Sequence, residues 1–338
     1  MKKASAYTLF MIFAAFFLAG CRHNNTLQSR LDECDSLVWS DPAKAYGLLQ
    51  GLHDSVYGYA DEGMQMRYEL IKTDALNKAK QPLTSDTTMK KVAAYFDDHK
   101  IIHQQVRAHY LLGRIYAEQK KPCEALQEFQ QADDIADTTR TDCDWRQLAL
   151  IHAQQTALYM FQQMNDLAIE ECENAKYFAL KAHDKAFYAQ FVELEGNIYS
   201  IITDFVKSEK CYRKAYNIYK TISTKDAANT AGLLSFTLID EGRYREAKRY
   251  MNEYERLSGQ FHKDNADGSM HEYAYYKGMI LLHDGKAQEA YEMFRCLFGH
   301  NRDDSIYAYN GLAQLYQSQG ETGKALQAYL GKKCLIIP

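Results

Sequence analysis

The chain has 338 residues, of which 46% are hydrophobic and 25% are charged, and its formal net charge is −4. This composition excludes an intrinsically disordered chain. The small negative charge argues against a nucleic-acid-binding protein, which needs a basic stripe to neutralise phosphates. Only four residues are proline, and because proline interrupts the hydrogen bonds of a helix, long uninterrupted helices are favoured.

The N-terminus has the pattern of an export signal. Two lysines precede an apolar run over residues 7–19, which is shorter than a membrane-spanning helix requires. The run ends in the sequence LAGC at residues 18–21, which resembles the bacterial lipobox. The resemblance implies that residues 1–20 are a lipoprotein signal peptide and that acyl chains such as palmitate on Cys21 anchor the chain in a membrane. The alternative is an ordinary signal peptide with a chance cysteine.

The following segments predict helices. In SDPAKAYGLLQGL, at residues 40–52, Asp41 can cap the start of a helix whose leucines form one apolar side. Residues 64–79 and 87–100 predict a further helix pair. We interpret residues 21–105 as N-terminal helices that are degenerate relatives of the repeat described next.

One spacing recurs six times after residue 105. A tyrosine or leucine is preceded three residues earlier by a small residue and followed nine residues later by another small one; four residues further comes a bulky or soft apolar residue. The leading positions are Tyr116, Tyr159, Tyr199, Leu238, Leu281 and Tyr316. The later small positions are Ala125, Ala168, Ser208, Ala247, Ala290 and Ala325. Three copies also have a glycine four residues after the leading position, at Gly242, Gly285 and Gly320.

This spacing predicts pairs of antiparallel helices. Helices approach closely only where small residues meet, so Gly113 is expected to face Ala125, while Tyr116 and Phe129 fill the space on either side. Glycine within a helix costs about 1 kcal/mol relative to alanine, and the closer packing must offset that cost. The glycines four residues after the leading position are expected to adopt the left-handed conformation that ends the first helix of a pair.

The first copy resembles the tetratricopeptide repeat, whose pattern is Leu-Gly-x-x-Tyr followed by Ala-x-x-x-Phe. The matching residues are Leu112, Gly113, Tyr116, Ala125, Phe129 and Ala132. His109, Asp137 and Lys332 depart from the family, which prefers tryptophan, proline and a small residue at these positions. The resemblance implies an all-α fold, a right-handed superhelical solenoid of antiparallel helix pairs, with about six repeats over residues 106–330.

The copies are more widely spaced than in that family. Their small positions are 35 to 43 residues apart, whereas the family's period is about 34. The excess predicts extended helices, or loops such as residues 262–269 and 299–305. The last predicted helix begins near Gly323 and is expected to stop before a short tail at residues 331–338, which suggests a truncation because a solenoid normally ends in a capping helix.

No readable motif for catalysis, a cofactor or a metal occurs in the sequence. His99 and His103 are four residues apart but lack a third ligand, and DNADG at residues 264–268 lacks the oxygen ligands of a calcium loop. The cysteines after Cys21 show no CxxC spacing, and we interpret most of them as small buried hydrophobic residues. We therefore expect no catalysis, no cofactor and no bound metal.

The tetratricopeptide resemblance also implies a concave groove lined by the first helix of each repeat. Its expected lining residues are Arg107, Tyr110, Arg114, Glu193, Asn197, Ser200, Phe236, Tyr275, Met279, Tyr307, Asn310 and Gln314. Tyrosine and arginine concentrate binding energy at interfaces, so a protein or peptide partner is expected there.

The whole chain resembles bacterial envelope lipoproteins in which a lipobox precedes irregular tetratricopeptide repeats. This resemblance implies a lipid-anchored interaction scaffold in the cell envelope, with no nucleic acid bound by this chain. The residues after Cys21 lack the acidic run that similar lipoproteins use for surface export, so the periplasmic face of the outer membrane is favoured. Two alternatives remain: the truncated sensory half of a transmembrane transcriptional regulator, and a glycan-binding surface lipoprotein, which the presence of only two tryptophans disfavours.

Overall fold

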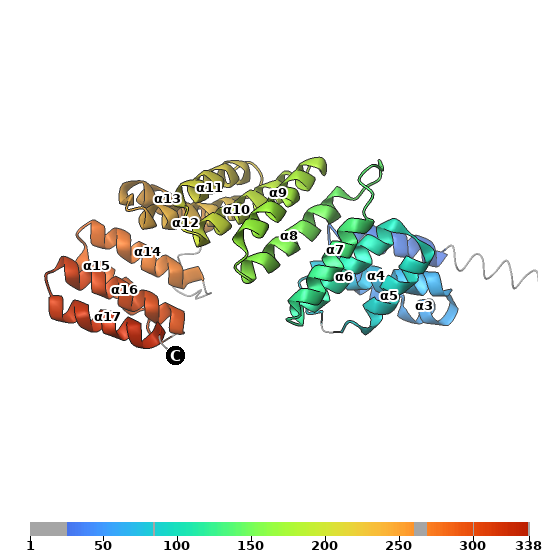
Figure 1. Cartoon of the computed structure of the whole chain (residues 1–338), viewed down its shortest axis with the longest axis horizontal. Coiled ribbons are helices and arrows are strands. Elements are labelled where there is room, and N and C mark those ends of the chain that lie inside the picture. The colour runs from blue at the N-terminus through green and yellow to red at the C-terminus, as the bar shows by residue number, and fades with distance from the viewer. Residues whose placement is uncertain (1–25, 84, 260–268, 300, 337–338) are drawn as a thin grey trace, which may run out of the picture. The chain divides into compact units, whose positions relative to one another are not determined.

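A computed structural model describes residues 26–83, 85–259, 269–299 and 301–336. Over these ranges the chain is helical and contains no strand (Figure 1). It divides into two compact units, each described by itself below: unit 1 ends at Met164 and unit 2 begins at Asn165. The predicted all-α fold of helix pairs is confirmed, and the division falls inside the stretch that we expected to form one solenoid.

Unit 1 consists of a helix over residues 26–37 followed by α2 (Pro42–Gln50), α3 (His53–Tyr59), α4 (Glu62–Lys78), α5 (Thr87–His99), α6 (Ile102–Glu118), α7 (Pro122–Ile135) and α8 (Trp145–Phe161). Asp41 caps α2 as predicted, because its carboxylate accepts a hydrogen bond of 3.0 Å from the amide of Lys44. Helices α4 and α5 match the two helices predicted upstream of the repeat. Helix α6 packs against α4, α5, α7 and α8 and is therefore central to this unit.

Unit 2 consists of α9 (Asn165–Lys181), α10 (Lys185–Ile201), α11 (Phe205–Tyr219), α12 (Thr224–Asp240), α13 (Tyr244–Ser258), α14 (Ser269–His283), α15 (Ala287–Arg295), α16 (Arg302–Ser318) and α17 (Thr322–Ile336). Sequential helices form hairpins: α10 packs with α11, α12 with α13, α14 with α15 and α16 with α17. The first helices of successive hairpins also touch, since α14 packs against both α12 and α16. One face of unit 2 is thus built from α12, α14 and α16.

The glycine in the first helix of a hairpin makes room for an aromatic ring. A β-carbon added to Gly113 would lie 2.6 Å from Cε1 of Phe129, and one added to Gly196 would lie 2.7 Å from the ring of Tyr212. Gly278 meets the ring of Phe294 in the same way. The expectation that Gly113 faces Ala125 is therefore corrected. The large residue of the second helix, rather than the small one, sits on the glycine.

A left-handed residue follows the first helix in all six copies of the repeat. Gly242, Gly285 and Gly320 have φ angles of 74°, 76° and 74°, which confirms the prediction for these glycines. The equivalent residues of the other copies are Lys120, Gln163 and Thr203, with φ angles of 59°, 59° and 61°. The turn geometry therefore belongs to the repeat, and three copies adopt it with side chains that pay a conformational penalty for it.

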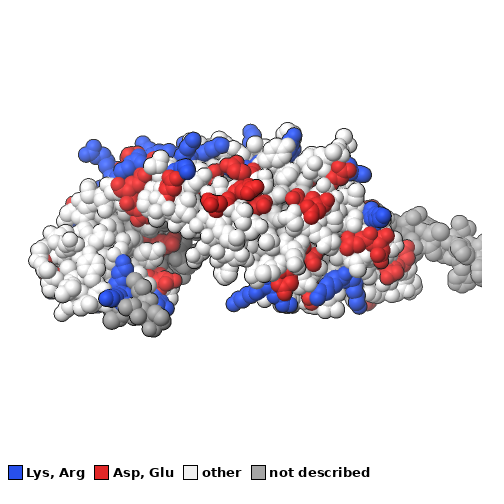
Figure 2. Space-filling view, viewed as in Figure 1, with Lys and Arg blue, Asp and Glu red and all other residues white. Residues whose placement is uncertain are grey.

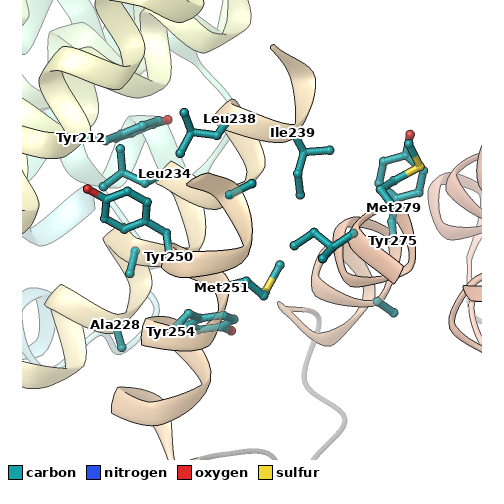
Figure 3. Packing of buried hydrophobic residues seen from close by; sticks show 14 of the residues in the cluster. Tyr212, Ala228, Leu234, Leu238, Ile239, Tyr250, Met251, Tyr254, Tyr275 and Met279 are labelled. Carbon is teal, nitrogen blue, oxygen red and sulfur yellow. The ribbon is translucent and has the colours of Figure 1, made fainter. Parts of the chain in front are cut away.

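The core of unit 2 is continuous from one hairpin to the next. Figure 3 shows Leu234 and Leu238 of α12 beside Tyr250 of α13, with Met251 on the part of α13 that faces α14, the helix that carries Met279. All five side chains are buried. Each hairpin therefore covers apolar surface that its neighbour would otherwise expose, as expected for stacked repeats.

The structure changes several boundaries that we expected from the sequence. Helix α16 begins at Arg302, where Asn301 caps it by accepting from the amide of Asp304 at 2.8 Å, so the loop expected over 299–305 is shorter. Helix α17 continues to Ile336, so most of the expected tail is helical. Residues 1–20, Cys21 and the DNADG segment lie outside the described residues. The loop expected over 262–269 lies outside them as well, except for Ser269.

The cysteine interpretation holds for half of the side chains that the structure describes. Cys34, Cys172 and Cys211 are buried, whereas Cys123 and Cys296 are exposed and Cys143 is half-buried. Burial raises the pKa of Cys172 and of Cys211 to about 12, which keeps both thiols protonated. In the described part of the chain, no helix combines the length and apolar character that crossing a bilayer requires.

Candidate functional site

Charge pairs join α4, α6 and the helix over residues 26–37 in unit 1. Arg107 of α6 donates from Nη1 to Asp35 and from Nε to Asp74 of α4, both at 2.6 Å. Lys78 also contacts Asp74, at 2.7 Å. Burial disfavours the charged form of Asp74, but Arg107 and Lys78 outweigh this effect and lower the pKa of its carboxyl group. Arg107 is therefore committed to contacts within the protein.

The other two residues that we expected to bind a partner in unit 1 are also engaged. Arg114 donates to Asn77 at 3.1 Å, to Gln154 at 2.7 Å and to Glu118 at 3.3 Å. Tyr110 is only 3% exposed, and its ring lies 6.0 Å from that of Phe129. These contacts link α4, α6 and α8, so both side chains hold the unit together.

A cavity of about 380 Å³ lies beside this charge network in unit 1. Its lining combines apolar residues with charged ones, notably Arg67, Arg107, Arg140, Asp35 and Asp142. The arginines are paired with aspartates; for example, Arg140 binds Asp142 through two hydrogen bonds of 2.9 and 2.8 Å. Four aspartates and three arginines line the cavity, so it offers no concentration of positive charge to a molecule that enters it.

Unit 2 presents a different surface, which we call the aromatic surface and define by Phe236, Asp240, Tyr275, Tyr276 and Tyr307. Phe236 of α12 stacks on Tyr276 of α14, with ring centroids 4.3 Å apart and planes at 11°. Tyr275 lies 5.0 Å from Tyr307 of α16 and 5.1 Å from Tyr276, centroid to centroid. Three successive first helices therefore contribute to one row of rings.

Polar contacts fix the rings of the aromatic surface. Asn310 donates to the hydroxyl of Tyr275 at 2.7 Å, and Gln314 donates to the same oxygen at 3.5 Å. The hydroxyl of Tyr276 donates to Asp240 at 3.3 Å. Burial raises the pKa of Tyr275 to about 12, so its hydroxyl keeps its proton at neutral pH.

Asp240 is the charged group of this surface. Burial by its neighbours raises the pKa of its carboxyl group to about 6, although the hydrogen bond from Tyr276 acts in the opposite direction. The side chain nevertheless remains exposed to solvent on one side. It also ends α12, and the C-terminus of a helix carries partial negative charge. Negative potential is therefore concentrated beside the row of rings.

The expected groove residues of α10 form a separate polar group. Glu193 accepts a hydrogen bond from Thr230 of α12, and burial raises the pKa of its carboxyl group. Asn197 accepts from the hydroxyl of Tyr212 at 2.7 Å, and Ser200 is half-buried nearby on the same helix. These side chains hold α10 against α11 and α12.

The remaining expected residues border the aromatic surface. Tyr275 and Met279 are 7% and 5% exposed, which places them in its floor rather than on its exposed face. Met279 and Gln314 also line a second cavity of about 360 Å³, together with Tyr244 and His283. The rings of Tyr244 and His283 stack there with centroids 4.4 Å apart.

Exposed positive side chains lie along the second helices of the hairpins in unit 2. Figure 2 shows Lys and Arg side chains along the edge over α11 and α13, while the part over α14–α17 is mainly uncharged in this view. Exposed members of the basic edge are Lys207, Lys210, Lys214, Arg245, Lys248 and Arg249. Several are paired, such as Lys248 with Asp284 at 2.5 Å. Among the residues that the structure describes, no cluster of three or more His, Cys, Asp or Glu side chains could hold a metal ion.

The sequence analysis missed Asp240 and Tyr276, which complete the aromatic surface. They lie four residues after Phe236 and three before Met279, both of which were predicted to line the groove. Residues four or three apart share a helix face. Extending the predicted groove residues of α12 and α14 by one helical turn would therefore have identified both side chains.

Comparison with known proteins places the fold. No family model matches the sequence, and no curated protein matches it. The structure is similar to the apo form of RapI, with a TM-score of 0.61 and 12% identity over 80% of this chain and 97% of that one. It is also similar to the apo form of the quorum sensor NprR from B. thuringiensis, with a TM-score of 0.60 and 13% identity over 93% of this chain and 99% of that one.

A third similar structure contains a ligand. NprR in complex with its cognate peptide NprX matches with a TM-score of 0.57 and 14% identity, over 91% of this chain and 89% of that one. At such identities the likeness shows the fold alone. The chain is a helical-repeat protein with a tetratricopeptide-like fold, as the six-copy spacing predicts.

Proposed function

We propose that the chain is a lipid-anchored protein of the cell envelope that binds a protein or peptide partner on the aromatic surface of unit 2. The observation that carries the binding proposal is the row of rings contributed by α12, α14 and α16. Aromatic side chains supply large contact areas at low entropic cost, and they are enriched among residues that dominate binding energy. The surface combines such rings with amide and carboxylate groups that can fix the orientation of a peptide.

The fold supports the same proposal. A similar solved structure, NprR, is in complex with its cognate peptide, and a surface assembled from successive first helices suits an extended chain. Unit 1 is less suited to this role, because its expected binding residues are buried or paired within the protein. We therefore assign the proposed partner-binding site to unit 2.

Binding would be tested with the full chain in detergent micelles, immobilised and exposed to a solubilised envelope fraction. A variant with Phe236→Ala and Tyr307→Ala should lose the captured partner. The control, Tyr177→Ala, removes a ring that is 53% exposed on α9 and should retain it. Equal recovery by both variants would remove the assignment of binding to the aromatic surface.

The lipid anchor rests on the LAGC sequence at residues 18–21. Cells grown with an alkyne analogue of palmitate should label the wild-type protein, whereas Cys21→Ser should abolish labelling and release the protein from membranes. Cys123→Ser, which changes an exposed cysteine, is the matched control and should label normally. Labelling of the Cys21→Ser variant would refute the anchor.

We further propose that the protein lies on the periplasmic face of the outer membrane. Membranes separated on a density gradient should contain it in the outer-membrane fraction, and protease added to intact cells should leave it uncut. Cleavage in intact cells would place it on the outer surface instead.

A further inference from the structure

An acidic side chain on the aromatic surface lacks a counter-charge. Asp240 is exposed at the end of α12, and among the described residues it has no ion-pair partner; its carboxylate accepts a hydrogen bond from the hydroxyl of Tyr276. Most other acidic groups of the hairpins are paired, as Glu209 is with Arg213 and Arg243. An unpaired carboxylate that is partly removed from water lowers the stability of the folded state.

Two lysines of the neighbouring helices are engaged elsewhere. Lys332 donates to Asn310 at 3.3 Å, and Lys277 contacts Glu255 at 2.5 Å. Further acidic groups add to the negative potential: burial is the main cause of the raised pKa of Tyr307, and Glu272 and Asp303 join Asp240 in raising it further. The aromatic surface is therefore acidic as well as rich in rings.

Rings and an unpaired carboxylate together suit one kind of ligand group. A cation gains energy over the face of an electron-rich ring and pairs directly with a carboxylate. The long stems of lysine and arginine also pack their methylene groups on apolar surface while the charged head stays polar. Phe236 and Tyr276 provide half-buried rings for such a stem, next to Asp240.

We infer that the aromatic surface recognises a lysine or arginine side chain of the partner peptide, whose charged head pairs with Asp240 and whose stem packs on Phe236 and Tyr276. This inference rests on the proposed peptide binding and names the chemistry that selects the partner. The raised pKa of Asp240 agrees with it, since a cation bound there would restore the charged form of the carboxyl group.

The test selects peptides directly. The full chain in detergent micelles is panned against a display library of random 12-residue peptides, in parallel with Asp240→Asn and with a charge-matched control. The control is Asp166→Asn, which changes an exposed acid in the first turn of α9. Peptides enriched by the wild type and by the control should contain lysine or arginine at a fixed position, and Asp240→Asn should not enrich them.

Titration calorimetry then measures how much the basic residue of the peptide and Asp240 depend on each other for binding. One selected peptide is synthesised in four forms, which carry the selected basic residue, the other basic residue, norleucine or glutamate at that position. The two basic forms show whether lysine or arginine is preferred. Norleucine should weaken binding to the wild type about tenfold and binding to Asp240→Asn by less than about twofold. Phe236→Leu should weaken binding of the basic peptide while circular dichroism shows an unchanged helical fold.

The outcomes separate the two proposals. Selected peptides without a basic residue, or an equal norleucine effect on wild type and Asp240→Asn, would overturn the inference and leave peptide binding standing. Failure of the library to yield any peptide would overturn both. Because Asp240→Asn removes an unpaired charge, its melting temperature should equal or exceed that of the wild type, so lost binding cannot be attributed to unfolding.

Discussion

The ring of Phe129 lies directly against Gly113, so that a β-carbon at position 113 would come within 2.6 Å of it. Phe129 is fully buried and cannot swing into solvent. Glycine is therefore required at this helix position for a steric reason, because the ring occupies the volume that any side chain would need.

Gly113→Ala should lower the free energy of unfolding by about 1–3 kcal/mol, because overpacking outweighs the gain of about 1 kcal/mol in helix propensity. Gly47→Ala is the control, since Gly47 lies inside α2 with open space around its Cα, and it should stabilise the protein. Chemical denaturation followed by circular dichroism measures both. A stabilised Gly113→Ala variant would contradict the packing described here.

The left-handed turns predict opposite effects of glycine at two threonines. Thr203 has a φ angle of 61°, so Thr203→Gly should relieve strain and raise the free energy of unfolding by about 1 kcal/mol. Thr221 does not have a positive φ angle, and Thr221→Gly should destabilise the protein. Melting temperatures compare the two; a shift of the same sign in both would count against strain at Thr203.

The pairing of Arg107 with Asp74 predicts a large effect of removing one charge. Arg107→Met leaves Asp74, which is 1% exposed, with Lys78 alone, and should cost about 3 kcal/mol in the free energy of unfolding. The comparison is Arg140→Met, which breaks an exposed pair with Asp142 and should have little effect. Equal losses in the two variants would show that burial of the pair is unimportant.

His109 predicts a stability that depends on pH. Burial opposes its charged form, but hydrogen bonds to Glu128 at 2.6 Å and to Asp97 at 3.2 Å outweigh burial and raise its pKa. A raised folded-state pKa stabilises the protein below the unfolded pKa of about 6.5, and this contribution disappears as the pH rises through the folded-state value.

Denaturation at a series of pH values from about 5.5 to about 9 brackets the ordinary histidine pKa of about 6.5. The wild type should lose more stability with rising pH over this range than His109→Gln does. His53→Gln, which changes an exposed histidine of α3, should follow the wild-type curve. Parallel curves for the wild type and His109→Gln would rule out this role for His109.

The repeat spacing was sufficient to predict the helix pairs and the three glycine turns, because positions three and four residues apart share a helix face and the nine-residue step spans the turn between two helices. It could not identify which side chains remain available for binding. Arg107 and Arg114 have the residue type and register of ligand-binding positions, yet their partners Asp35, Asp74 and Asn77 come from helices whose pairing the spacing does not specify. Availability depends on long-range neighbours, and a local pattern contains no information about them.

The same limit explains the aromatic surface. Phe236, Tyr275 and Tyr307 follow from the repeat register, but the stacking of Phe236 on Tyr276 depends on how α14 is rotated against α12. The missing counter-charge of Asp240 is likewise a property of all neighbouring helices together.

Phe294 has a consequence for how unit 2 opens. Its ring lies against Gly278 of its own hairpin and also against Gly311 of the following one. Separation of either hairpin uncovers one side of this buried ring, so we expect the two hairpins to open together when the C-terminal end frays. Backbone amides of α14 and α16 should consequently exchange with deuterated solvent at a common rate, as one cooperative segment.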